Sequence, residues 1–344
     1  MSKNMDVSKR KQSIIAGGLI SSAGIFFAKF IGLFYAVPYN SMLGTADNLA
    51  YYGVAFNIYS YLLNICTAGF PFAIATLIAK YSTRGDYQTS LLIKKLSASL
   101  MTCFGFGMMI IVILFSSPLA ALVMPDEGNS VKTMQMVLIL ISFALFFVPL
   151  LSSIRGFYQG LKHMEIYALS QVLEQVARVA FLLSASAIAV YALHTDQVWA
   201  LYFGVISTSI SAILAIMHLK LYDKKQMREL KRLAKTQEVA GNNDRREILK
   251  GLVFIAFPYL IVAILGYSDT IVNTLFLSKG LEAHGNTDAE ILLISGSINY
   301  GVLKLMSIPM ILAPGFSSAI IPHITTALTN HDLKLVRKNI RDCV

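Results

Sequence analysis

Five ionisable residues lie inside apolar stretches that are each long enough to cross a bilayer: Lys29, Glu174, Arg178, Asp269 and Lys304. A charged side chain at the centre of a membrane helix costs about 2.5 to 3.5 kcal/mol, so it normally faces a partner or a polar cavity. Glu174 and Arg178 are four residues apart with the acid first, a favourable spacing for an ion pair on one helical face. We expect these two to pair; a role in ion coupling is the alternative.

Lys29 and Lys304 have no acid at helical spacing within their own stretches. Two such cations facing one cavity would suit an anionic group such as a pyrophosphate. The alternatives are that the lysines extend to the membrane surface or pair with Asp269. Asp269, which Thr270 follows, is in turn a candidate for coupling to Na+ or H+.

The composition identifies an integral membrane protein. Hydrophobic residues make up 56% of the 344 residues and charged residues 14%, whereas about a quarter of a soluble domain is charged. Long apolar runs favour helices over the alternating ten-residue segments of a membrane barrel. The predicted fold class is therefore an all-α membrane protein.

Eight membrane-spanning helices are expected. Basic residues concentrate in cytoplasmic loops, and 24 of the 29 lysines and arginines fall on one side of this arrangement. We therefore expect both termini in the cytoplasm, and we interpret the net charge of +10 as an orientation signal with no nucleic-acid partner. The expected spans are 13–37, 50–79, 96–123, 133–154, 166–193, 198–219, 251–277 and 291–314.

A basic segment, residues 220–250, separates the sixth and seventh spans. It holds ten lysines and arginines against five acids. We interpret it as a charged linker, the alternative being a patch for nucleic acid or anionic lipid. The predicted division is residues 1–220 as one six-helix lobe, 221–250 as the linker and 251–344 as the start of a second lobe. Residues 222–234 have the spacing to extend the sixth helix.

A weak internal repeat supports two lobes. Residues 69–86 align with residues 315–332 without a gap, and the identities include Gly69 with Gly315 and Asp86 with Asp332. The offset encloses six spans, so the two copies have the same orientation, as in transporters built from parallel repeats. The second unit has only two helices, so we expect a fragment of a longer protein; a closed eight-helix architecture is the alternative.

The sequence contains no enzyme signature. There is no P-loop and no nucleophile elbow, and the three cysteines and six histidines lack metal-ligand or redox spacing. We expect no enzyme activity, no metal site and no cofactor other than a coupling ion. The absence of a nucleotide-binding domain also argues against a primary pump within this chain.

Several motifs carry a resemblance to a known family. They are Ser21-Ser22 with Ala28-Lys29-Phe-Ile-Gly32, Gly69-Phe-Pro, Arg155-Gly-Phe-Tyr-Gln-Gly160, the stretch 171–178, and Lys304-Leu-Met-Ser-Ile-Pro309 followed by Ile321-Pro322. In this order and topology the chain resembles the MOP flippase superfamily, and within it the MurJ-like and YtgP/SpoVB-like polysaccharide transporters of bacteria. The resemblance covers essentially the whole chain.

This resemblance implies a multi-pass protein of the bacterial cell membrane. The full-length members of the family have 14 helices, and two six-helix lobes flank a central cavity. Such a transporter flips an undecaprenyl-pyrophosphate-linked sugar precursor by alternating access, in peptidoglycan or other polysaccharide biosynthesis. Lys29 and Lys304 match positions whose cations hold the pyrophosphate in MurJ members. Leu63-Asn64 stands where Gram-negative MurJ sequences have arginines, which favours the YtgP/SpoVB branch over lipid II as the sole substrate.

Two other functions remain open at this stage. One is a cation-coupled multidrug exporter of the related MATE type, which would need acidic residues lining the first lobe. The other is a non-transporting fragment. In each case we expect a monomer in the lipid bilayer.

Overall fold

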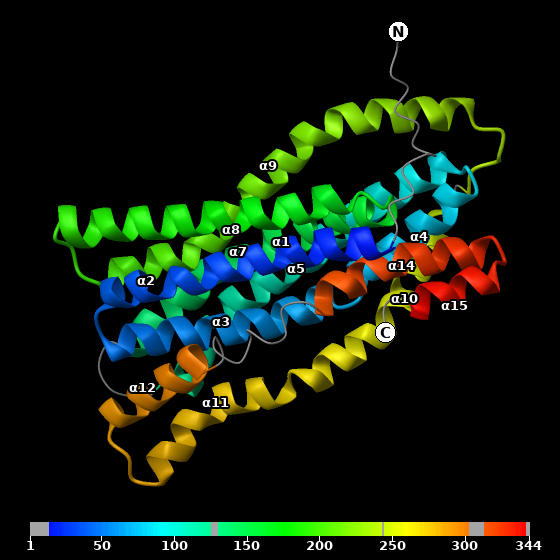
Figure 1. The fold of residues 1–344 in the computed structure, drawn as a ribbon. Helices are drawn as coiled ribbons and strands as arrows, with labels where there is room; N and C mark the ends of the chain where they lie inside the picture. Colours follow the sequence, from blue (N-terminus) through cyan, green and yellow to red (C-terminus); the bar gives the residue numbers. More distant parts are fainter. Residues whose placement is uncertain (1–13, 125–129, 243, 303–312, 342–344) are drawn as a thin grey trace.

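The computed structural model is an all-helical bundle and describes residues 14–124, 130–242, 244–302 and 313–341. Figure 1 shows the long helices lying side by side along one direction, with connections at both ends of the bundle. In chain order the elements are α1 (Ile14–Phe34), α2 (Ala36–Leu43), α3 (Ala46–Thr67), α4 (Phe70–Thr83), α5 (Tyr87–Leu114), α6 (Ser116–Val123), α7 (Ser130–Gly160), α8 (Met164–Ala187), η1 (Ile188–Ala192), α9 (Val198–Thr236), α10 (Arg245–Gly266), α11 (Ser268–Ala283), α12 (Asp288–Gly296), η2 (Ser297–Val302), α14 (Ala313–Thr329) and α15 (Leu333–Arg341).

Seven segments in the described ranges are long and apolar enough to cross a membrane. They correspond to the first seven expected spans, so the chain is a multi-pass helical membrane protein. The eighth expected span, 291–314, lies partly outside the described residues. Its described parts are most of α12, all of η2 and the start of α14, and α14 continues to Thr329, well past the expected end.

The second span bends at Gly69, as Gly69 and Pro71 in the sequence predict. Helix α3 ends at Thr67, and α4 begins at Phe70 after Gly69, whose φ is +72°. Glycine adopts this left-handed conformation without steric cost, and Pro71 lies in the first turn of α4, where its missing N–H is harmless. The bend lets α4 turn towards α10.

Helix α7 lies at the centre of the first six spans and contacts α3, α4, α5, α6 and α9. Its glycines allow close approach to α4, because a Cβ atom at Gly156 would lie 2.9 Å from the Pro71 carbonyl oxygen. A Cβ atom at Gly160 would lie 2.7 Å from the Cβ of Ile78. The motif from Arg155 to Gly160 is therefore a helix-packing motif as well as a family signature.

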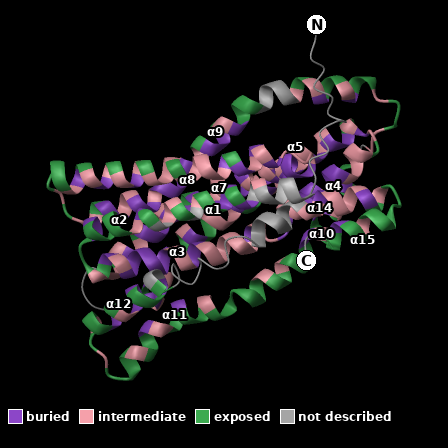
Figure 2. Ribbon diagram, in the orientation of Figure 1, coloured by how far each residue is buried: buried purple, intermediate pink, exposed green. Residues whose placement is uncertain are grey.

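Two buried apolar clusters fill the bundle. The first draws mainly on α2, α3, α6, the first half of α7 and the start of α9, with Leu292 of α12. The second draws mainly on α4, α5, the end of α7 and the later part of α9, with three residues of α10. Because the clusters use different parts of α7 and α9, each end of the bundle has its own core. Figure 2 shows these interior segments in purple.

The last described helices cover one side of this lobe. Helix α10 packs on α4, while α14 packs on α1 and α4. Much of α10 and α11 is exposed, as Figure 2 shows, and Phe254 is 81% exposed. At the other side of the connection, α9 continues as one helix to Thr236, which confirms the expected extension over 222–234.

Candidate functional site

The two lysines expected to hold an anion fall outside what the structure describes. Lys29 belongs to α1, but its side chain is outside the described part, and Lys304 lies within 303–312, which is also outside. Helix α1 does contact α14, the later part of the eighth segment. No position follows from this contact for Lys304, because α14 begins at Ala313.

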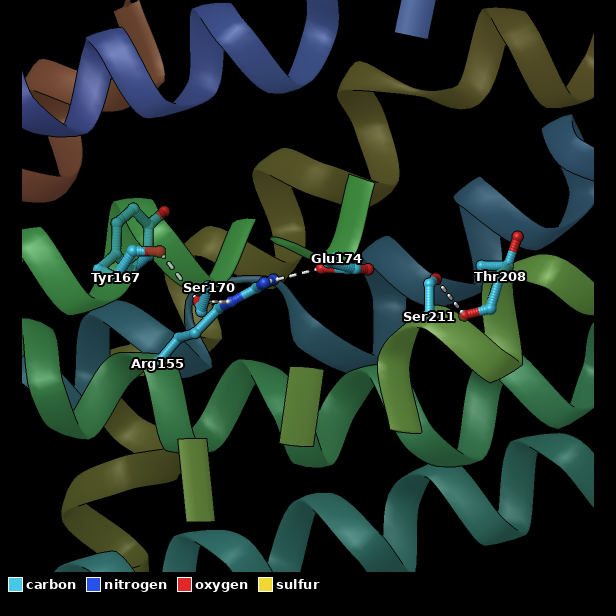
Figure 3. A network of polar contacts seen from close by, with 6 residues as sticks. All are labelled: Arg155, Tyr167, Ser170, Glu174, Thr208 and Ser211. Carbon is cyan, nitrogen blue, oxygen red and sulfur yellow. Dashed lines mark hydrogen bonds and ion pairs between the residues drawn. The ribbon is translucent and has the colours of Figure 1, made fainter. Parts of the chain in front are cut away.

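An ion pair joins α7 to α8 within the apolar bundle. Arg155 Nη2 lies 2.7 Å from Glu174 Oε2, an ion-pair contact. Arg155 Nε donates to the Ser170 hydroxyl at 2.7 Å, and that hydroxyl donates to the Tyr167 carbonyl at 2.9 Å. Figure 3 shows this chain of contacts between the two helices. Nearby on α9, the Ser211 hydroxyl donates to the Thr208 carbonyl at 3.0 Å.

Glu174 therefore has a second cationic neighbour besides the expected Arg178, with which it interacts electrostatically. Within the described ranges, the cation in ion-pair contact with Glu174 is Arg155, at the end of α7. The close packing of Gly156 and Gly160 against α4 fixes where the end of α7 lies, and Arg155 reaches across to α8 from there. Spacing along one helix could not reveal a partner from a different helix.

Arg178 instead lies among buried tyrosines. It interacts electrostatically with Tyr35, Tyr52 and Tyr59 as well as with Glu174. The hydroxyl oxygens of Tyr35 and Tyr52 are 3.5 Å apart, and both side chains are buried. The Arg178 Nε atom is buried without a hydrogen-bond partner among the described residues. An arginine stays charged in such surroundings, so the first lobe contains a buried cation with an unused donor.

A polar bridge connects the first lobe to the helices that follow the linker. The Asn57 amide on α3 donates to Asn299 Oδ1 on η2 at 2.9 Å and to the Thr274 hydroxyl on α11 at 3.3 Å. Thr274 and Asn299 are almost fully buried, at 1% and 5% exposure. Amides and hydroxyls have few other partners in a membrane, so this Asn57–Thr274–Asn299 bridge is a specific contact of α3 with α11 and η2.

A second contact between these parts lies towards the end where α4 and α14 finish. The Thr83 hydroxyl donates to the Thr326 hydroxyl at 3.3 Å. Asp269, by contrast, is exposed on α11, and within the described residues its carboxylate accepts a 3.4 Å hydrogen bond from Thr270. The alternative in which Asp269 pairs with a lysine of the first or eighth span has no described contact to support it.

Sequence reasoning from charge missed this neutral bridge. The signal was present, because Asn57, Thr274 and Asn299 are polar residues within apolar spans. A neutral amide side chain costs less free energy to place in a membrane than a charged side chain does. It therefore marks an intramembrane site less clearly in the sequence.

The family profile described as "Polysaccharide biosynthesis protein" matches residues 14–328. The chain belongs to this family. The expected resemblance to polysaccharide-related membrane proteins is thereby confirmed.

Curated members of the polysaccharide biosynthesis protein family show how much of a longer protein this chain matches. It is 31% identical over 338 residues to the lipid II flippase MurJ of Bacillus subtilis (strain 168), covering 95% of this chain and 60% of that protein. Identity to the stage V sporulation protein B of the same organism is 21% over 337 residues, covering 97% of this chain and 62% of that protein. The chain thus spans about 60% of these relatives, and the departure at Leu63-Asn64 does not accompany a closer match to the sporulation protein.

Solved structures show the same fold. A MOP superfamily transporter from Pyrococcus furiosus aligns with a TM-score of 0.69 at 14% identity, covering all of this chain and 71% of that one. An outward-facing multidrug resistance MATE family transporter aligns with a TM-score of 0.68, also at 14% identity and with the same coverage. This family member therefore has the MOP fold over the part of the transporter that it spans.

Proposed function

We propose that this family member moves a lipid-linked sugar precursor across the bacterial cytoplasmic membrane by alternating access. The observation that carries the proposal is the 31% identity to the Bacillus subtilis lipid II flippase along 95% of the chain. The substrate class is an undecaprenyl-pyrophosphate-linked saccharide, either lipid II or a related wall or polysaccharide intermediate.

Within this proposal, Lys29 and Lys304 bind the pyrophosphate. This assignment rests on the family resemblance of the two positions, because neither side chain lies in the described part of the structure. Asp269 is the proposed residue for coupling to Na+ or H+, and its exposure on α11 leaves it accessible to an ion. The basic end of the bundle faces the cytoplasm in this proposal, as the distribution of lysine and arginine favours, and the transporter acts as a monomer.

The test is rescue of a Bacillus subtilis strain depleted of its lipid II flippase activity. We expect the 344-residue chain, or the longer protein that contains it, to restore growth and to lower the accumulated lipid-linked precursor. The Lys29→Ala, Lys304→Ala double variant should lose rescue while its membrane abundance stays unchanged. The matched control is Lys132→Ala, Lys279→Ala, since both lysines lie in the expected outer connections.

Rescue by the Lys29→Ala, Lys304→Ala variant would remove the role given to these lysines. Drug efflux with no change in precursor level would instead favour the multidrug exporter. If the longest available form of the protein shows neither rescue of the flippase-depleted strain nor drug efflux, the protein is not a transporter of either kind.

A further inference from the structure

A groove with a basic rim lies between α4 and the first half of α10. Its volume is about 1080 Å³, and four cations line it: Lys80 from α4, and Arg245, Arg246 and Lys250 from α10. Its apolar wall includes Leu77, Val253, Phe254 and Phe257. Pockets that hold small ligands have about 300 to 1,000 Å³, so this groove is large enough for a ligand.

The described residues do not neutralise the charges of the rim. Among the residues that the structure describes, none of the four cations forms an ion pair. Lys80 Nζ lies 5.6 Å from the centre of the Tyr81 ring. The one acid of the groove, Glu247, accepts a 3.0 Å hydrogen bond from the Asn242 amide. The rim therefore presents a net positive charge.

The wall of the groove is apolar and exposed. Phe254 is 81% and Phe257 is 56% exposed. Arg246 and Phe257 are eleven positions apart on one helix, which corresponds to about 16 Å at 1.5 Å per residue. This length is close to half of a hydrocarbon core of about 30 Å, so the groove is long enough to hold the first part of an acyl chain beside a headgroup.

A buried polar hub holds the rim in place. Asp86, which is 3% exposed, accepts hydrogen bonds from Thr89 N at 2.9 Å, from Gln237 Nε2 at 3.3 Å and from Asn242 N at 3.4 Å. Asp244 then caps α10 by accepting from Arg246 N at 2.8 Å. The connection between α9 and α10 is thus fixed to the α4–α5 turn, and this fixes the position of the arginines at the start of α10.

We propose that this groove binds an anionic phospholipid of the cytoplasmic leaflet. The phosphate lies on the rim of Lys80, Arg245, Arg246 and Lys250, and an acyl chain lies along Phe254 and Phe257. Basic pockets between helices at the cytoplasmic side are suited to acidic lipid headgroups, and arginine matches the geometry of a phosphate. The proposal shares only the cytoplasmic orientation of the basic end with the proposed function, so its failure would leave the flippase proposal standing.

The test uses tryptophan quenching by brominated lipids in nanodiscs that contain the 344-residue chain. Trp199→Phe removes the single tryptophan, and Phe257→Trp places a reporter in the groove. Brominated phosphatidylglycerol should quench this reporter more strongly than brominated phosphatidylcholine. Each basic side chain that contacts the headgroup should raise the affinity for phosphatidylglycerol over phosphatidylcholine by about fivefold. A reporter from Phe106→Trp, at an exposed position of α5, should show no preference.

The rim is tested with Arg246→Gln, Lys250→Gln in the Phe257→Trp background, which should abolish the preference for phosphatidylglycerol. The matched control is Lys95→Gln, Lys220→Gln, because these two lysines line a different groove, of about 430 Å³, between α5, α7 and α9. Equal quenching by both lipids at position 257 would overturn the proposal. So would a lack of quenching by either lipid, since the groove would then be covered by further helices or a second copy.

Discussion

Asn57 and Asn299, which are separated by 242 positions in the sequence, share a 2.9 Å hydrogen bond between α3 and η2. This contact joins the lobe before the linker to the helices after it. Because the Asn299 side chain is almost fully buried, loss of its donor would leave a buried oxygen with less compensation.

We expect Asn57→Ala to destabilise the chain by about 1 to 3 kcal/mol, the usual cost of leaving a buried polar group unsatisfied. A double-mutant cycle with Asn299→Ala should give a coupling of about 1 kcal/mol, measured by unfolding in mixed micelles. Asn64→Ala is the matched control, since the Asn64 amide donates to the Ser60 carbonyl of its own helix. If Asn57→Ala and Asn64→Ala lower the stability of the chain equally, the bridge to Asn299 has no special role.

The partner of Glu174 can be identified by the same method. We expect a coupling of about 1 kcal/mol between Arg155→Met and Glu174→Gln, because the two side chains form a half-buried ion pair and removing one member leaves the other less well compensated. The coupling between Arg178→Met and Glu174→Gln should be clearly smaller. A larger value for the Arg178 cycle would restore the pairing that the spacing along α8 predicts.

Alanine substitutions at three glycines can distinguish the energetic cost of a positive φ from the cost of a steric clash with a neighbouring helix. Gly69 has a φ of +72° and a Cβ there would lie 2.5 Å from Tyr259 Cβ, whereas Gly85 has a φ of +78° with no atom within 4 Å. Gly107 on α5 has an ordinary helical φ and no atom within 4 Å. We expect Gly69→Ala to cost the most, Gly85→Ala about 1 kcal/mol, and Gly107→Ala to be neutral or stabilising.

The ranking of the three variants is measured by thermal unfolding in one detergent. A Gly69→Ala variant no less stable than Gly85→Ala would show that α4 and α10 do not approach as closely as described. That result would also weaken the α4–α10 groove.

The Asp86 hub should protect the connection between α9 and α10 from proteolysis. We expect Asp86→Ala to increase the rate of trypsin cleavage at Arg245 and Arg246 by about tenfold, since it removes both a helix cap and the contacts to Gln237 and Asn242. Asp196→Ala is the control, because Asp196 accepts from Val198 N at the opposite end of the bundle. Unchanged cleavage in Asp86→Ala would show that the hub does not hold the connection.

The sequence alone predicted the spans well where length and polarity decide the outcome. Insertion into a membrane depends on these two properties, so seven of the expected spans have counterparts in the structure. The bend at Gly69 was also predictable, since glycine and proline act on the local backbone. The end of α14 was not predictable in this way, because Pro314 lies in its first turn, where proline is tolerated.

The polar contacts were predicted less well because they depend on which helices meet. Arg155 reaches Glu174 from another helix, and Asn57 meets residues more than two hundred positions away. The sequence places each of these residues in a span but does not say which span lies beside it. Asp269 was singled out by its charge, yet it is exposed and contacts its neighbour Thr270.

The length of α9 has a mechanical consequence. Its 39 residues extend about 58 Å, nearly twice a hydrocarbon core of about 30 Å, and only eight residues separate its end from α10. The link from the first six spans to α10 is therefore one long helix followed by a short connection. The end of α9 is also anchored, because the Gln88 amide on α5 donates to the Ala234 carbonyl at 2.9 Å. A nanobody that binds this end of α9 would therefore hold α5 and the connection to α10 together, from outside the expected spans.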